Sequence, residues 1–86
     1  MRTIKRYELR EGENRITVPN LSELVFATDE EGKVWVWMEV DTVEKETNER
    51  SFLVMAAEEE IKEKMSLGFT GWGKIGEKMV MIFEIL

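Results

Sequence analysis

The residues best suited to ligand binding lie in one short segment, Phe69-Thr70-Gly71-Trp72-Gly73-Lys74. Glycines on both sides of Trp72 would let a ligand approach the backbone, and the indole could stack on a flat ring. Lys74 could then meet a phosphate of the same ligand. Because stacking of a base on an aromatic ring contributes about 1–3 kcal/mol, we expect Thr70, Trp72 and Lys74 to bind a nucleotide or cyclic oligonucleotide. The alternative is that Trp72 plugs the end of the core and Lys74 lies on a turn.

Three arginines could add contacts to an anionic ligand. Arg50 opens an otherwise apolar strand, and its planar guanidinium suits bidentate binding of a phosphate or carboxylate. The alternative for Arg50 is a structural salt bridge to Glu39 or Asp41. Arg6 and Arg10 lie in the basic N-terminal part of the chain, where strand alternation places both on one face.

The composition offers few groups for catalysis or metal binding. The chain has no histidine and no cysteine, so catalysis would depend on carboxylates, lysines or hydroxyls, and no paired set stands out. We therefore expect a binding protein, not an enzyme, with no metal site and no cofactor. The net charge of −6 argues against duplex nucleic acid as a partner, because counterion release requires a basic surface. The sequence has no apolar run long enough to predict a membrane span and no signal-peptide pattern at its start. We therefore expect a cytoplasmic protein.

Alternating apolar residues and turn signals predict a mainly β, small α+β fold, in a single domain of residues 1–86. An antiparallel meander of about six to seven strands would form a compact barrel or sandwich. The expected strands are 4–9, 15–18, 24–28, 34–41, 51–56, 69–72 and 78–86, with a hairpin through 10–14, a hairpin turn over 29–32, a loop over 42–49 and a turn over 73–77. One short amphipathic helix is expected near residues 57–65, because Ala57, Ile61 and Met65 recur every four residues.

Two of these strands, 34–40 and 79–86, are apolar on both faces. A chain of this length buries only about 60–65% of its unfolded surface, and one short helix would cover only part of one sheet face. We therefore expect a homo-oligomer, since exposed apolar patches of that size are rare on monomers. A closed monomeric barrel is the alternative. The expected interface residues are Trp35, Trp37, Val80 and Ile82.

Several short motifs follow one another along the whole chain. They are Lys5-Arg6-Tyr7-Glu8-Leu9, Pro19 before an apolar strand, Gly32 to Trp37 followed by Val40-Asp41, Arg50-Ser51-Phe52-Leu53-Val54, Phe69-Thr70-Gly71, and Val80-Met81-Ile82-Phe83-Glu84. Their order resembles a family of small phage and prophage proteins of unassigned function. That family reads Lys-Tyr-x-Leu, Pro, Trp-x-x-Val-Asp, Arg-x-Phe, Tyr-Ile-Gly-Thr and a closing Val-Phe-His-Val-Phe-Glu. Here the family's Thr-Gly-His-Pro segment is replaced by Met55-Ala56-Ala57-Glu58 and its closing His by Met81, so no role of those histidines carries over.

The resemblance implies a phage-encoded protein and frames two functional hypotheses. In the first, the chain is a small anti-defence protein that sequesters a cyclic oligonucleotide signal of host immunity. In the second, it is a protein-binding inhibitor of a host defence complex or a virion accessory component, whose acidic surface meets a basic partner. The sequence leaves both hypotheses open.

Overall fold

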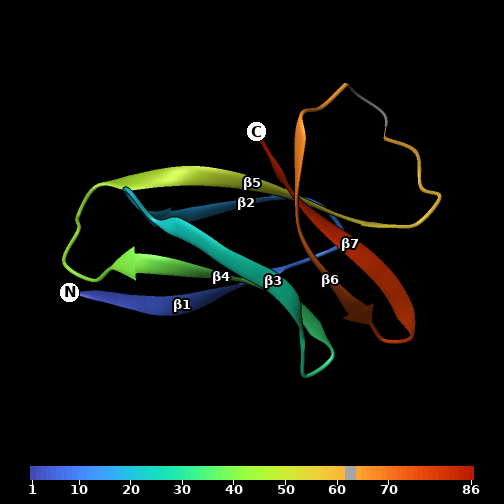
Figure 1. Cartoon of the computed structure of the whole chain (residues 1–86), viewed down its shortest axis with the longest axis horizontal. Coiled ribbons are helices and arrows are strands. Elements are labelled where there is room, and N and C mark those ends of the chain that lie inside the picture. The colour runs from blue at the N-terminus through green and yellow to red at the C-terminus, as the bar shows by residue number, and fades with distance from the viewer. Residues whose placement is uncertain (62–63) are drawn as a thin grey trace.

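The computed structural model describes residues 1–61 and 64–86, and these form one seven-stranded β-sheet that curls into a nearly closed barrel (Figure 1). The strand order is β1-β4-β3-β6-β7-β5-β2. Neighbours are antiparallel except for β3 and β6, which run parallel. The order is therefore not that of a simple meander. The strands are β1 (Arg2–Leu9), β2 (Gly12–Pro19), β3 (Glu23–Glu30), β4 (Lys33–Asp41), β5 (Thr47–Ala56), β6 (Leu67–Ile75) and β7 (Lys78–Ile85).

The first two strands do not form the expected hairpin. β1 pairs with β4 along its whole length and β2 pairs with β5, so β1 and β2 are the two edges of the curled sheet. The chain passes from one edge to the other through Arg10 and Glu11. Asn14 holds this corner, because its Oδ1 accepts the N–H of Arg10 at 2.8 Å and its Nδ2 donates to the carbonyl of Arg10 at 2.7 Å. Pairing with β4 is favoured because it buries Leu9 beside Val34.

The hairpin between β3 and β4 is confirmed. Glu31 and Gly32 connect the strands with φ values of 57° and 79°, the positive values that a two-residue turn of type I′ requires. Two other expected connections are shorter than the sequence indicated. Residues 47–49 belong to β5, where they pair with β2, and the turn before β7 is limited to residues 76–77.

The core fills the inside of the curl with alternate residues of the central strands. Every second residue of β4 points inward, and Trp35 and Trp37 therefore lie on the outer face. The most deeply buried of the inward side chains are each at most 2% exposed, and they include Val34, Val36, Met38, Val40, Phe52, Val54, Val80 and Ile82. The curl of the sheet thus covers one face of each of the two strands that are apolar on both faces, without a second subunit.

The expected helix near residues 57–65 is wrong for the described residues 57–61 and 64–65, which form turns and irregular structure. Residues 62 and 63 lie outside the described residues. β5 and β6 run in the same direction on either side of β7. The connection from the end of β5 to the start of β6 must therefore cover the distance from residue 80 to residue 85 of β7, which is roughly 17 Å of strand. A nine-residue helix spans only about 13 Å, and the positive φ of Glu58, 71°, interrupts helical geometry at its start.

In the part of the chain that the structure describes, no helix has the length and apolar character needed to cross a membrane.

Candidate ligand-binding face

Gly71 and Gly73 of β6 lie against the backbone of β3, not beside open space. Gly71 pairs with Ala27, and a Cβ added at Gly71 would lie 2.8 Å from the carbonyl carbon of Ala27 and closer still to its oxygen. A Cβ at Gly73 would lie 2.7 Å from the backbone nitrogen of Asp29. These glycines therefore permit a close approach of the chain to itself. The expectation that they open the backbone to a ligand is wrong.

Two side chains of β3 form hydrogen bonds with the backbone of β6 and stabilise this contact. The hydroxyl of Thr28 donates to the carbonyl of Trp72 at 3.0 Å. The carboxylate of Asp29 accepts the backbone N–H of Lys74. Both bonds use main-chain groups of β6, so they fix the strand without engaging the side chains of Trp72 and Lys74.

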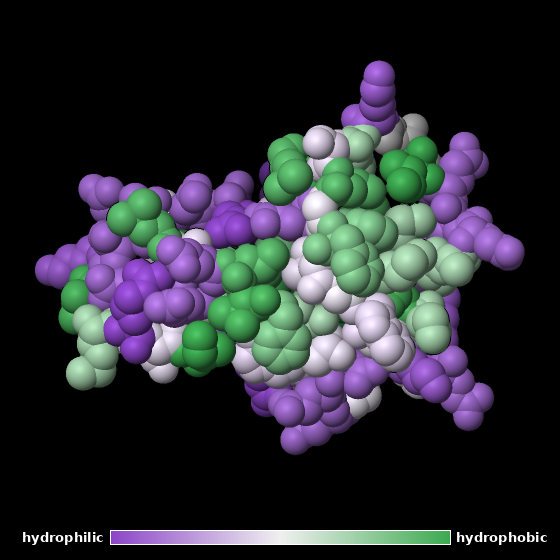
Figure 2. Space-filling model, viewed as in Figure 1, coloured by the Kyte–Doolittle hydropathy of each residue, from purple (hydrophilic) through white to green (hydrophobic). Residues whose placement is uncertain are grey.

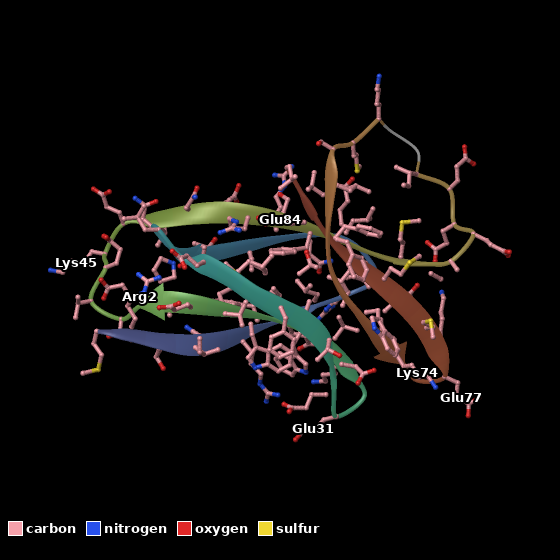
Figure 3. All side chains as sticks on the ribbon, viewed as in Figure 1. Arg2, Glu31, Lys45, Lys74, Glu77 and Glu84 are labelled. Carbon is pink, nitrogen blue, oxygen red and sulfur yellow. The ribbon has the colours of Figure 1, made fainter. Side chains whose placement is uncertain are left out.

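Trp72 and Lys74 lie two residues apart on the outer face of β6, and both are exposed. Trp72 is 55% exposed, so it does not plug the core. Across the sheet they lie opposite Met81 and Met79 of β7. Among the side chains that the structure describes, the ammonium group of Lys74 has no ion-pair partner, and Figure 3 shows it beside the β6–β7 turn. A ring and an available cation therefore share one face, although on a strand and not on the expected turn.

The third predicted residue of this segment, Thr70, has a local role. Its side chain is half-buried, and its hydroxyl donates to the carbonyl of Gly68 at 3.1 Å. A register shift between Phe69 and Gly71 leaves Phe69 63% exposed, with its ring edge-on to Phe83 at 5.8 Å between centroids. The structure thus brings Phe69 to the surface near Trp72, and no pattern in the sequence indicated this.

A second group of aromatic residues lies on the outer face of β3 and β4. Phe26 stacks on Trp37 with ring centroids 4.9 Å apart and planes within 5°. The guanidinium of Arg6 lies 3.9 Å from the centre of the Trp35 ring, a cation–π contact, and it also pairs with Glu30. Figure 2 shows the side of the barrel formed by β3, β6 and β7, where hydrophobic residues cover the middle and hydrophilic residues form the margins.

Arg50 lies on the inner side of β5 and is committed to the fold. Its Nε and Nη2 donate to the two oxygens of Glu84, the latter at 2.9 Å, and its Nη1 donates to the carbonyl of Ser22 at 3.0 Å. Glu84 raises the pKa of Arg50, chiefly through its hydrogen bond to the guanidinium. The expected salt bridge exists, but with Glu84 of β7 and not with Glu39 or Asp41. Arg50 is therefore not available as a ligand-binding residue.

Arg10 lies at the corner between β1 and β2, away from the aromatic face. It lines a small cavity of about 170 Å³ together with Glu8, Glu11 and Lys33. Arg6 and Arg10 are thus not brought together by strand alternation, because β1 ends at Leu9.

A family model described as "Domain of unknown function (DUF7352)" matches residues 1–75. The chain belongs to the DUF7352 family. No curated protein and no solved structure matches the chain. The match ends before β7, yet β7 lies between β6 and β5 and supplies Val80 and Ile82 to the core. In this DUF7352 protein, the sheet therefore depends on a strand that follows the matched residues.

Two motifs that carry the resemblance noted in the sequence meet in the DUF7352 fold. Arg50 opens the Arg-x-Phe motif and Glu84 closes the last motif, and the two form the ion pair described above. Phe52 of the first motif pairs directly with Glu84 across β5 and β7. These motif residues therefore have structural roles in joining the central strands.

The interface predicted for a homo-oligomer is only partly accessible. Val80 and Ile82 are 0% exposed, so their assignment to an interface is wrong; they face inward because the sheet curls around them. Trp35 and Trp37 are half-buried on the outer face. The outward residues of β7 are instead Met79, which is 54% exposed, Met81 and Phe83. Assembly into an oligomer stays a prediction.

Two further features complete the description of possible sites. A cavity of about 370 Å³ lies between β5, the start of β2 and the residues after β5, and its apolar wall includes Leu53, Met55 and Met65. No pattern in the sequence indicates this cavity, because its walls combine the start of β2 with residues 53–65. Within residues 1–61 and 64–86, no group of three or more acidic side chains is placed to hold a metal ion.

Proposed function

We propose that this DUF7352 protein is a non-catalytic module that sequesters a base-containing phosphate ligand, such as a cyclic oligonucleotide, on the outer face of β6 and β3. The observation that carries the proposal is the exposed Trp72 ring with Lys74 two residues away on the same face. A flat aromatic ring stacks on any base, and a neighbouring cation interacts favourably with phosphate. The lack of histidine and cysteine in the sequence favours binding over catalysis.

The bonds to β3 support this role for Trp72. Because Thr28 and Asp29 hold the main chain of β6, the indole is carried by a rigid strand, and little backbone ordering would accompany ligand binding. The overall charge of −6 opposes long polyanions, whereas a ligand with one or two phosphates needs only a local cation. The proposal therefore favours a small nucleotide over a nucleic acid.

The resemblance to small phage proteins suggests a biological setting for such a module. A virus-encoded protein that binds a cyclic oligonucleotide would lower the free concentration of a host immune signal. The anti-defence role is thus part of the proposal, and binding of the signal is the step to test first.

The test is a binding measurement with cyclic di- and trinucleotides by calorimetry, supported by thermal shift. A ligand at 100 times its dissociation constant should add about 2.7 kcal/mol to the free energy of unfolding. Trp72→Ala should weaken binding by about 1–3 kcal/mol. Lys74→Ala should weaken binding most at low salt, where the charge contact is least screened. Lys45→Ala is the matched control, since Lys45 lies at the opposite end of the barrel (Figure 3).

A protein partner is the second candidate, and the exposed apolar side chains favour it. Phe69 and Met79 are more than half exposed on either side of Trp72 in the sheet, and methionine-rich surfaces adapt well to protein partners. The charge of −6 indicates a partner with a basic rim, as expected for an inhibitor of a host defence complex. If no nucleotide binds the wild type while Phe69→Ala abolishes inhibition of the host system, the protein-partner function replaces the first proposal.

A further inference from the structure

The Phe26 side chain is stacked on one side and partly exposed to solvent. Its ring lies parallel to Trp37 at 4.9 Å, which covers one side. Phe26 is nevertheless 45% exposed. Phe26 is on β3, which lies between β4 and β6. Because Trp37 covers Phe26 from the β4 side, the exposed part of Phe26 lies toward β6 or above the sheet. A ring already stacked on one face is held in a fixed orientation, which lowers the entropy cost of stacking a second ring on it.

Phe26 and Trp72 are close neighbours across the contact between β3 and β6. Ala27 pairs with Gly71, and the hydroxyl of Thr28, two residues from Phe26, bonds to the carbonyl of Trp72. In this parallel register Phe26 and Trp72 are diagonal neighbours on adjacent strands. Phe26 faces outward because its neighbour Ala27 is buried, and Trp72 faces outward because its neighbour Gly73 is buried.

The charges around the two rings suit a ligand with phosphates. Lys74 follows Trp72 on β6, and Arg6 lies beyond β4 against Trp35. Arg6 also pairs with Glu30, so it neutralises an acid at this edge of the face. Two stacking rings beside Lys74, which has no ion-pair partner among the described side chains, suit two bases joined by phosphate.

We infer that Phe26 is a second stacking residue and that the ligand of this face carries two bases, as a cyclic dinucleotide does. The inference rests on the proposed function and adds the number of bases that the face recognises. Trp72 would hold one base near Lys74, and Phe26 would hold the other.

The experiment compares a panel of cyclic dinucleotides with the corresponding mononucleotides on the wild type and three variants. Phe26→Ala should weaken binding of the cyclic dinucleotide by about 5- to 150-fold and leave mononucleotide binding within about twofold. Trp72→Ala should weaken both. Lys45→Ala is the control, because Lys45 lies at the opposite end of the barrel from Lys74 (Figure 3), and it should change neither affinity more than about twofold.

The outcomes separate this inference from the function on which it rests. If the wild type binds mononucleotides as tightly as dinucleotides, or if Phe26→Ala leaves dinucleotide binding unchanged, the inference is overturned while the proposed function stands. If the wild type binds neither class, the proposed function itself fails. Should Phe26→Ala lose its fold, Phe26→Leu decides, since leucine retains apolar cover over Trp37 but cannot stack on a base.

Discussion

Substitution of Gly71 by alanine tests the central structural claim, that glycine in β6 serves the contact with β3. The added Cβ would overlap the carbonyl group of Ala27, a backbone atom that cannot rotate away. The two strands would have to separate, which would also break the bonds from Thr28 and Asp29 to the backbone of β6. Overpacking costs about 1–3 kcal/mol, and each lost bond about 1 kcal/mol. Gly71→Ala should therefore lower the free energy of unfolding by about 3–5 kcal/mol.

The assay is urea unfolding followed by tryptophan fluorescence, together with thermal unfolding by circular dichroism. For a domain of this size, 1 kcal/mol corresponds to about 4–8 °C, so the midpoint should fall by roughly 12 °C or more. Gly68→Ala on the same strand is the matched control. Its Cβ would meet only the exposed side chain of Leu86, at 3.5 Å, so it should change stability by less than about 1 kcal/mol. Equal stability of the two variants would refute the reasoning.

Two further predictions concern charged groups of the fold. Arg50→Ala should lower the free energy of unfolding by about 3 kcal/mol in chemical denaturation, because it leaves the half-buried carboxylate of Glu84 without its partner. Arg2→Ala, the control, breaks an exposed pair and should lower it by less than about 1 kcal/mol. Similar losses in both variants would contradict the structural role of Arg50. The pKa of Asp41 should lie below its ordinary value of 3.8 in an NMR titration, chiefly because its carboxylate accepts the backbone N–H of Val43 at 3.1 Å. A lowered pKa means that Asp41 stabilises the fold above pH 3.8 and loses this contribution as the pH falls through the folded-state pKa, so Asp41→Asn should reduce stability at pH 6 more than at pH 2.

Local patterns in the sequence were enough to predict several elements. The turn at residues 29–32 was found because Gly32 follows polar turn residues between two apolar runs, and such a turn depends only on neighbouring residues. The β-strand character of residues 34–41 and 78–85 followed from their composition. Trp72 and Lys74 were candidates from their residue types, but only the structure shows that Trp72 is exposed and that both lie on β6.

The tertiary structure decided which of several compatible arrangements these elements adopt. Residues 34–40 are apolar on both faces, so their sequence could not show that Val36 faces inward and Trp37 outward; the curl of the sheet decides this. The pairing of β1 with β4 and of β2 with β5 joins residues far apart in the chain, and no local pattern encodes such partners.

The roles of single residues depended on the same distant contacts. Gly71 reads as a flexible position in the sequence, but the backbone of β3 alone determines that it must be glycine. Arg50 reads as a free anion-binding group, yet its partner is supplied by β7, 34 residues away. Residues 57–65 have helical periodicity, but a short helix forms only where packing supports it, and here the connection from β5 to β6 has to span the length of β7. In each case the residue type set what was chemically possible, and the position of a distant strand determined which possibility was realised.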